Sequence, residues 1–302
     1  MRRLPTLACC LAVAAAGLGA QVYRGGADVV ILNVTVTDAE AHFIPGLDRP
    51  DFKIFEDGVP QEVSTFARDP QPVALSILID TSASMDRKLP IAQEGAVGFA
   101  KRLGPKDMAE VIAFDTRPDI LQELTGDRVA LERAIRRTQV GGSTALYNAI
   151  YIALNRLSQA KSDSPDTYRR QAIVLLSDGE DTSSVLDYDS VLDAARRSEA
   201  GVYAIALRSR EDTPVHGFNA ADYVLRTLTQ ETGGRVYHVD DVAQLAAIYQ
   251  QVADELASQY YLGYTSKNSK RDGAWRRIAV RVDRPNVLAR TKAGYFAATT
   301  PR

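Results

Sequence analysis

The stretch that decides the fold is Val73–Asp80, VALSILID, which runs directly into Thr81-Ser82-Ala83-Ser84-Met85. A continuous apolar run of this length is typical of a strand that is covered on both faces, as in a parallel sheet. Comparable runs follow at 109–115, 171–178, 202–207 and 235–239. Apolar residues at helical spacing fill the intervals between them, at 90–103, 128–137, 144–157, 191–197, 223–230 and 242–256. This alternation predicts an α/β domain over residues 73–258, with a doubly wound, mostly parallel, Rossmann-like sheet.

The flanks of this domain have a different pattern. Residues 28–68 contain VVILNVTVTD and two short strands around Asp57-Gly58, a turn dipeptide typical of hairpins. Residues 259–297 contain QYYLGYT, WRRIAVRV and VLARTKAGYF, separated by polar turns. Each flank has about three strands, and small isolated sheets are marginally stable. We therefore expect the two flanks to pack together as one small, discontinuous β subdomain beside the α/β domain.

The N-terminus predicts export. Residues 1–20 read MRRLPTLACCLAVAAAGLGA, with Arg2 and Arg3 before a short apolar run and small residues at its end. This is the pattern of a cleaved signal peptide. The alternatives are a membrane anchor, for which the run is shorter than the roughly 20 residues needed, and lipid attachment at Cys9 or Cys10. After cleavage the chain has no transmembrane anchor and no cysteine, and we expect it in the periplasm or outside the cell.

The composition excludes several classes of function. The chain has 302 residues, of which 45% are hydrophobic, as in an ordinary globular protein. Its 36 basic and 38 acidic residues give a net charge of −2, so the chain lacks the basic excess that is typical of nucleic-acid-binding proteins. It has three histidines, His42, His216 and His238, which do not have metal-ligand spacing.

Oxygen-bearing side chains follow three of the predicted core strands or lie in the loops between them. Asp80, Ser82 and Ser84 form a D-x-S-x-S loop, Thr144 follows two glycines at the start of a helix, and Asp178 ends the strand at 171–178. Ligands of an open α/β sheet bind at the carboxyl ends of its strands, so these loops can converge there. Each loop alone would also fit a plain helix cap or turn. Their joint occurrence favours a metal site.

The chemistry of this set indicates which metal. Two carboxylates and three hydroxyls suit a hard cation, Mg²⁺, Mn²⁺ or Ca²⁺, rather than zinc, which prefers histidine and cysteine. Neutral hydroxyls leave the charge of a divalent ion incompletely balanced. An open coordination position would then accept water or a carboxylate from a partner.

These three segments resemble the metal-ion-dependent adhesion site, or MIDAS, of von Willebrand factor A domains. The resemblance implies that Ser82 and Ser84 bind the metal directly, and that Thr144, Asp80 and Asp178 bind it directly or through water. It covers about residues 73–258, and no position departs from the pattern. The flanks, including QYYLGYT and the closing KAGYF, resemble a secreted bacterial group described as VWFA-related, acidobacterial type.

No enzyme motif accompanies the site. The nearest string to a serine-hydrolase elbow is GGSTA, which lacks the closing glycine, and no P-loop or dinucleotide-binding glycine pattern is present. The sequence therefore predicts a metal-dependent, non-enzymatic adhesion or interaction module that binds a protein presenting Asp or Glu. The alternative is a structural or assembly component of the cell envelope, in which the metal has a purely structural role.

Overall fold

The computed structural model describes residues 29–69, 71–160, 169–178, 180–207 and 220–299. The predicted signal peptide at 1–20 and His216 lie outside these residues. Within the described part of the chain, no helix is both long and apolar enough to cross a membrane.

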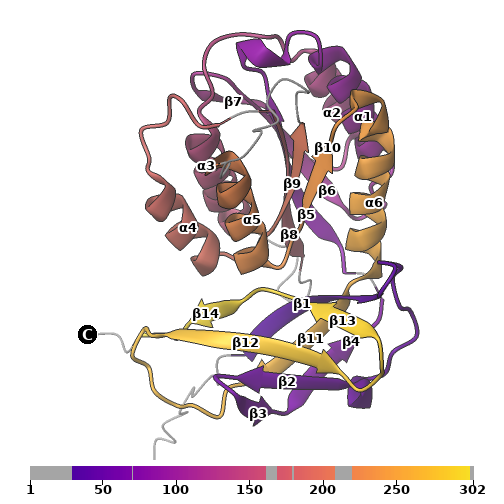
Figure 1. Cartoon of the computed structure of the whole chain (residues 1–302), viewed down its shortest axis with the longest axis vertical. Coiled ribbons are helices and arrows are strands. Elements are labelled where there is room, and N and C mark those ends of the chain that lie inside the picture. Colours follow the sequence, from indigo (N-terminus) through magenta and orange to yellow (C-terminus); the bar gives the residue numbers. More distant parts are fainter. Residues whose placement is uncertain (1–28, 70, 161–168, 179, 208–219, 300–302) are drawn as a thin grey trace, which may run out of the picture.

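A six-stranded sheet forms the centre of the α/β domain, in the order β10-β9-β8-β5-β6-β7 (Figure 1). Its strands are β5 (Val73–Asp80), β6 (Met108–Phe114), β7 (Pro118–Thr125), β8 (Arg170–Ser177), β9 (Gly201–Leu207) and β10 (Val236–Val239). All neighbours are parallel except β6 and β7. The predicted fold class is confirmed. Strand β7 was not predicted from the sequence, because this edge strand is only partly buried and has no continuous apolar run.

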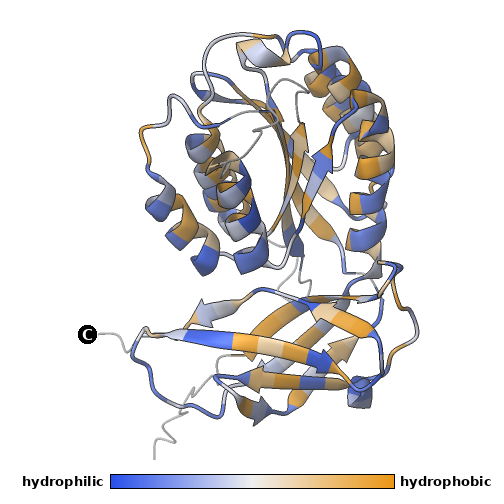
Figure 2. Ribbon diagram, viewed as in Figure 1, coloured by the Kyte–Doolittle hydropathy of each residue, from blue (hydrophilic) through white to orange (hydrophobic). Residues whose placement is uncertain are grey.

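Helices cover both faces of this sheet (Figure 1). One face carries α1 (Leu89–Lys101), α2 (Arg128–Arg136) and α6 (Leu245–Ser258), and the other carries α3 (Leu146–Gln159), α4 (Tyr188–Arg197) and α5 (Ala220–Thr232). Hydrophobic residues dominate the inner strands, as Figure 2 shows. Burial on both faces explains why all eight residues of β5 are inaccessible to solvent.

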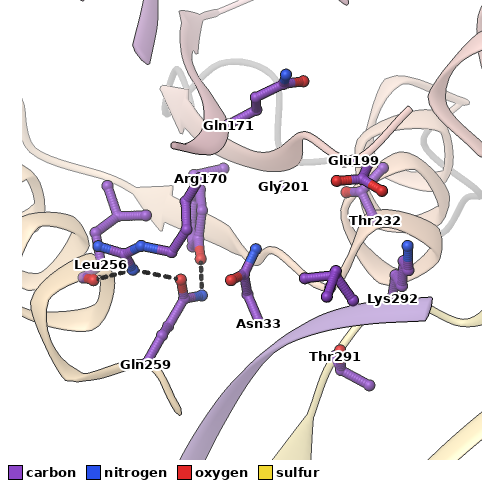
Figure 3. A pocket seen from close by; sticks show the side chains of 13 residues that line it. Asn33, Arg170, Gln171, Glu199, Gly201, Thr232, Leu256, Gln259, Thr291 and Lys292 are labelled. Atoms are coloured by element: carbon purple, nitrogen blue, oxygen red, sulfur yellow. Dashed lines mark hydrogen bonds between the residues drawn. The ribbon is translucent and has the colours of Figure 1, made fainter. Parts of the chain in front are cut away.

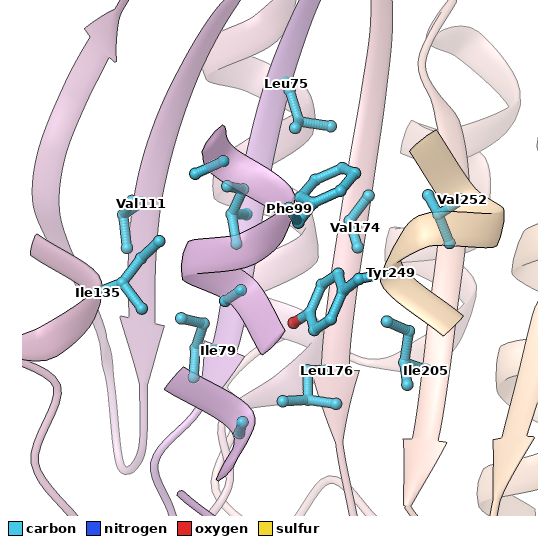
Figure 4. Close-up of a cluster of buried hydrophobic side chains, with 14 of the residues drawn as sticks. Leu75, Ile79, Phe99, Val111, Ile135, Val174, Leu176, Ile205, Tyr249 and Val252 are labelled. Carbon is cyan, nitrogen blue, oxygen red and sulfur yellow. The ribbon is translucent and has the colours of Figure 1, made fainter. Parts of the chain in front are cut away.

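Close packing between α1 and α6 fills one of the two cores (Figure 4). The rings of Phe99 and Tyr249 lie 5.4 Å apart between centroids. Gly95 on α1 permits this approach, because a Cβ atom there would lie 3.0 Å from the Tyr249 ring. Helix α6 is thereby held against the strands that carry the candidate site.

The flanking segments form two further sheets, each built from both ends of the chain (Figure 1). Their orders are β13-β1-β11-β4 and β14-β12-β2-β3. The strands are β1 (Val29–Asp38), β2 (Phe52–Glu56), β3 (Val59–Gln61), β4 (Val63–Ala67), β11 (Tyr260–Thr265), β12 (Trp275–Val282), β13 (Val287–Arg290) and β14 (Gly294–Phe296). The expected β subdomain is therefore present. Each flank has four strands rather than three, because the predicted runs at 63–67 and 294–296 are separate strands.

Buried polar contacts join the β subdomain to the α/β domain. Glu255 of α6 is fully buried and accepts hydrogen bonds from Thr35 of β1 and Tyr237 of β10, both at 3.2 Å, and from Arg290 of β13. Beside it, Gln259 accepts a hydrogen bond from Arg170 at 3.0 Å and donates one to the Tyr203 hydroxyl at 2.9 Å (Figure 3). The polar side of β1 thus faces the α/β domain.

Candidate metal centre

The candidate site lies where β5 and β8 end. The chain leaves β5 toward β6 on one side, while β8 pairs with β5 on the other side. This change of direction is the topological switch point, at which open α/β sheets bind their ligands. The 3₁₀ helix η2 (Ala83–Met85) follows β5 here, and α1 begins four residues later.

Asp80 is fully buried at the end of β5 and is held by two hydrogen bonds. Its Oδ1 accepts from the backbone N–H of Ser82 at 2.8 Å, and its Oδ2 accepts from the hydroxyl of Ser177 at 2.6 Å. Burial raises the pKa of Asp80, the hydrogen bonds from Ser177 and Ser82 oppose this change, and the negative charge of Asp178 adds to it. A buried pair of interacting carboxylates favours a cation beside it.

Asp178 has a nearly inaccessible side chain at the end of β8, with 1% of its surface exposed. Its Oδ1 accepts from the Ser84 hydroxyl at 2.7 Å, and the Ser84 and Ser82 hydroxyl oxygens lie 3.1 Å apart. Its Oδ2 lies 2.5 Å from Nζ of Lys88. The structure therefore brings Asp80, Ser82, Ser84 and Asp178 together in one connected set.

Thr144 lies in the second loop, which backbone hydrogen bonds join to the first and third loops. The Thr144 N–H donates to Thr182 Oγ1 at 2.9 Å, which links the second loop to the third. The N–H of Ala83 donates to the carbonyl of Gly142 at 3.1 Å, which links the first loop to the second. Gly142 also packs closely against Thr116, since a Cβ atom there would lie 2.0 Å from Thr116 Oγ1.

Asp181 positions the third loop and the start of α3. It accepts hydrogen bonds from the backbone N–H of Tyr147 at 3.1 Å and from the Ser184 hydroxyl at 2.5 Å. A carboxylate at the N-terminus of a helix satisfies backbone donors that would otherwise lack a partner. Asp181 therefore stabilises the loop that follows Asp178.

The donor set fits a hard divalent cation. Among the described residues, no three His, Cys, Asp or Glu side chains form a group that could hold a metal. Any metal at this edge would therefore depend on serine and threonine hydroxyls in addition to the two carboxylates. Such an all-oxygen set suits Mg²⁺, Mn²⁺ or Ca²⁺.

Two residues at the site were not identified from the sequence. Ser177 holds Asp80, and its position next to Asp178 in LLSD was the available signal. Lys88 contacts Asp178 from a position 90 residues away in the chain. Its charge lies four residues after Ser84, but a lysine in a polar loop is commonly solvated, so the pattern alone does not indicate this contact.

Residues 75–180 match the sequence model of the von Willebrand factor type A domain. Over 198 residues the chain is 25% identical to inter-alpha-trypsin inhibitor heavy chain H1 of Sus scrofa, covering 62% of this chain and 21% of that protein. Over 232 residues it is 26% identical to a UPF0353 protein of Mycobacterium leprae, covering 68% and 65%. The chain thus spans between 21% and 65% of the length of these relatives.

Two solved structures show the same fold. A von Willebrand factor type A protein from Catenulispora acidiphila aligns with a TM-score of 0.54 at 15% identity, covering 83% of this chain and 74% of that one. Proximal thread matrix protein 1 from the mussel byssus, with its MIDAS motif occupied by zinc, aligns with a TM-score of 0.50 at 14% identity, covering 64% and 50%. The α/β domain therefore has the von Willebrand factor A fold.

Proposed function

We propose that this chain is an exported module that binds a protein partner through a divalent cation. The cation would be held by Asp80, Ser82, Ser84, Thr144 and Asp178, an intact MIDAS. The observation that carries this proposal is the hydrogen-bonded set of carboxylates and hydroxyls at the switch point of the sheet. A type A domain is generally a module for protein–protein interaction, and the match over residues 75–180 supports that role.

The cation would provide a positive charge to which a partner carboxylate can bind. Because three of the five proposed ligands are neutral hydroxyls, an aspartate or glutamate from the partner would complete both the charge balance and the coordination. Mg²⁺ is the proposed ion, with Mn²⁺ or Ca²⁺ as substitutes. The zinc reported in the mussel protein's MIDAS shows that another ion can occupy a site of this type there.

The loops around the site would select the partner. Val185 lies in the third loop, and 93% of its surface is exposed. An exposed apolar side chain near a charged docking point is suited to contact a partner's apolar surface. The site would therefore combine one metal-bridged carboxylate with apolar contacts.

A non-enzymatic role fits the same residues. Metal-assisted hydrolysis would need a general base in addition to the metal ligands. Asp80 is engaged by Ser82 and Ser177, and Asp178 by Ser84 and Lys88. The signal-peptide pattern at 1–20 and the resemblance of the flanks to a secreted bacterial group support an exported protein.

Metal binding is the first test of this function. Mn²⁺ and Mg²⁺ are titrated calorimetrically into chelator-treated protein, with Asp80→Asn as the site variant. Asp187→Asn is the matched control, because Asp187 is an exposed helix cap of α4 and Asn caps helices equally well. Saturable binding by the wild-type protein and Asp187→Asn but not by Asp80→Asn is expected. Equal binding by all three proteins would contradict the site assignment.

Partner binding is the second test. Proteins cross-linked to the wild-type chain in cell-envelope extracts are compared with those cross-linked in EDTA and with those cross-linked to Asp80→Asn. A partner that is lost in both comparisons would support binding through the metal. A partner that is retained in both would instead indicate the structural alternative, in which the metal only holds the loops together.

A further inference from the structure

The candidate site contains a cation that belongs to the chain itself. Lys88 Nζ lies 2.5 Å from Asp178 Oδ2, and the other oxygen of this carboxylate accepts from the Ser84 hydroxyl. Only 1% of the Asp178 side chain is exposed. Both of its oxygens are therefore occupied by groups of the protein, and solvent contributes little.

We propose that Lys88 competes with the divalent cation for Asp178 and thereby sets the metal affinity of the site. This inference rests on the proposed function, because it assumes that Asp178 is a metal ligand or holds a metal-bound water. The ammonium group balances the charge of one of the two carboxylates when metal is absent. A divalent ion gains the full negative charge of Asp178 only when this ion pair opens.

The position of Lys88 allows its side chain to move away from Asp178. It immediately precedes α1, which begins at Leu89, so its side chain is anchored at the rim of the site. The side chain is 22% exposed, in contrast to the 1% of Asp178, so its long flexible stem has a path to solvent. Lys88 can therefore leave Asp178 without movement of β5 or β8.

The competition also explains how the loops keep their arrangement without metal. Two interacting carboxylates in a buried site would repel one another if neither had a cationic partner. The ion pair with Lys88 removes part of this repulsion and connects the loop after β5 to the end of β8, which lie 90 residues apart. Lys88 therefore stabilises the metal-free site and weakens metal binding by the same contact.

The test uses three variants of the full chain, with Mn²⁺ as the probe. Lys88→Met removes the charge at similar length, and Lys88→Arg keeps it. Lys101→Met is the matched control, because Lys101 lies at the other end of α1 and pairs with Glu132 at 2.8 Å. Calorimetry gives the Mn²⁺ dissociation constants, and thermal unfolding in EDTA gives the metal-free stabilities.

We expect Lys88→Met to bind Mn²⁺ about tenfold more tightly than the wild-type protein, a difference of about 1.4 kcal/mol, because the ion no longer has to displace a charged hydrogen bond from Asp178. In EDTA the same variant should melt at a lower temperature. Lys88→Arg and Lys101→Met should keep the wild-type affinity. A purely structural role for Lys88 would weaken metal binding and stability together, so the opposite directions of the two changes are diagnostic.

Other outcomes separate the two proposals. Unchanged or weaker Mn²⁺ binding by Lys88→Met, with binding lost in Asp80→Asn, would overturn the competition and leave the metal site standing. Absence of Mn²⁺ binding in the wild-type protein and in all Lys88 variants would overturn both.

Discussion

Replacement of Asp80 by two different residues separates its role in folding from its proposed role in metal binding. Both Asp80→Asn and Asp80→Ala remove the charge. Asn is isosteric and can still accept the hydrogen bond from the Ser82 N–H, while the Ser177 hydroxyl can rotate to accept from its amide. Ala accepts neither hydrogen bond, and it leaves the N–H of Ser82, a residue that is 2% exposed, without this acceptor.

The difference between the two variants can be estimated from these contacts. An unsatisfied buried polar group costs about 1–3 kcal/mol, so the loss of the acceptor for the Ser82 N–H gives about 2 kcal/mol. For a large domain, 1 kcal/mol corresponds to about 2–4 °C in Tm. In EDTA, Asp80→Ala should therefore melt about 4–8 °C below Asp80→Asn. The Asn variant should lie within about 1 kcal/mol of the wild-type protein.

The assay is thermal unfolding with EDTA and again with excess Mn²⁺. The wild-type protein should gain stability from Mn²⁺, because a ligand that binds only the folded state stabilises it. Neither variant should gain. The reasoning would be refuted if the two variants melted together in EDTA, or if Asp80→Asn gained as much stability from Mn²⁺ as the wild-type protein.

Three further predictions concern pH, the joint between the domains and the second loop. Burial raises the pKa of Asp80 above its usual 3.8, so the ionised carboxylate destabilises the folded metal-free protein and this penalty is lost as the pH falls toward 4. In EDTA, the urea midpoint of the wild-type protein should therefore rise relative to that of Asp80→Asn between pH 7 and pH 4.5. Arg290→Met leaves Glu255 buried without its cation and should lower the free energy of unfolding by about 3 kcal/mol. In a double-mutant cycle, the additional substitution Glu255→Gln should partly restore this free energy. Gly142→Ala should weaken Mn²⁺ binding about tenfold, or about 1.4 kcal/mol, because the new Cβ atom collides with Thr116 Oγ1. Calorimetry should show that the additional substitution Thr116→Ala partly restores the Mn²⁺ affinity.

Helix α6 forms part of the contact between the α/β domain and the β subdomain. Helix α6 packs against α1 through Tyr249 and Phe99, and it runs directly into β11 of the β subdomain. Glu255 and Gln259 at its C-terminal end bind residues of both domains. Helix α6 therefore connects the β subdomain to α1, the helix that begins directly after Lys88 of the candidate site.

The sequence by itself determined the α/β class and the order of most elements. The run Val73–Asp80 predicted a strand covered on both faces, because its first seven residues are all apolar or small, as is typical of a doubly buried strand. The Asp57-Gly58 dipeptide predicted a tight turn, and both residues have positive φ, 48° and 82°. These properties are local, so a short window of residues carries the whole signal.

The tertiary structure decided which distant residues meet. The ion pair of Lys88 with Asp178 spans 90 residues, and the hydrogen bond from Thr35 to Glu255 spans 220. The strands of the two flanks alternate in the sheet β13-β1-β11-β4, and the other small sheet joins the flanks through the pair β12–β2, an arrangement that neither flank specifies alone. Residue types and their spacing in the sequence identified the candidate ligands. The contact of Lys88 with Asp178 depends instead on how α1 packs beside the sheet, which no local sequence pattern specifies.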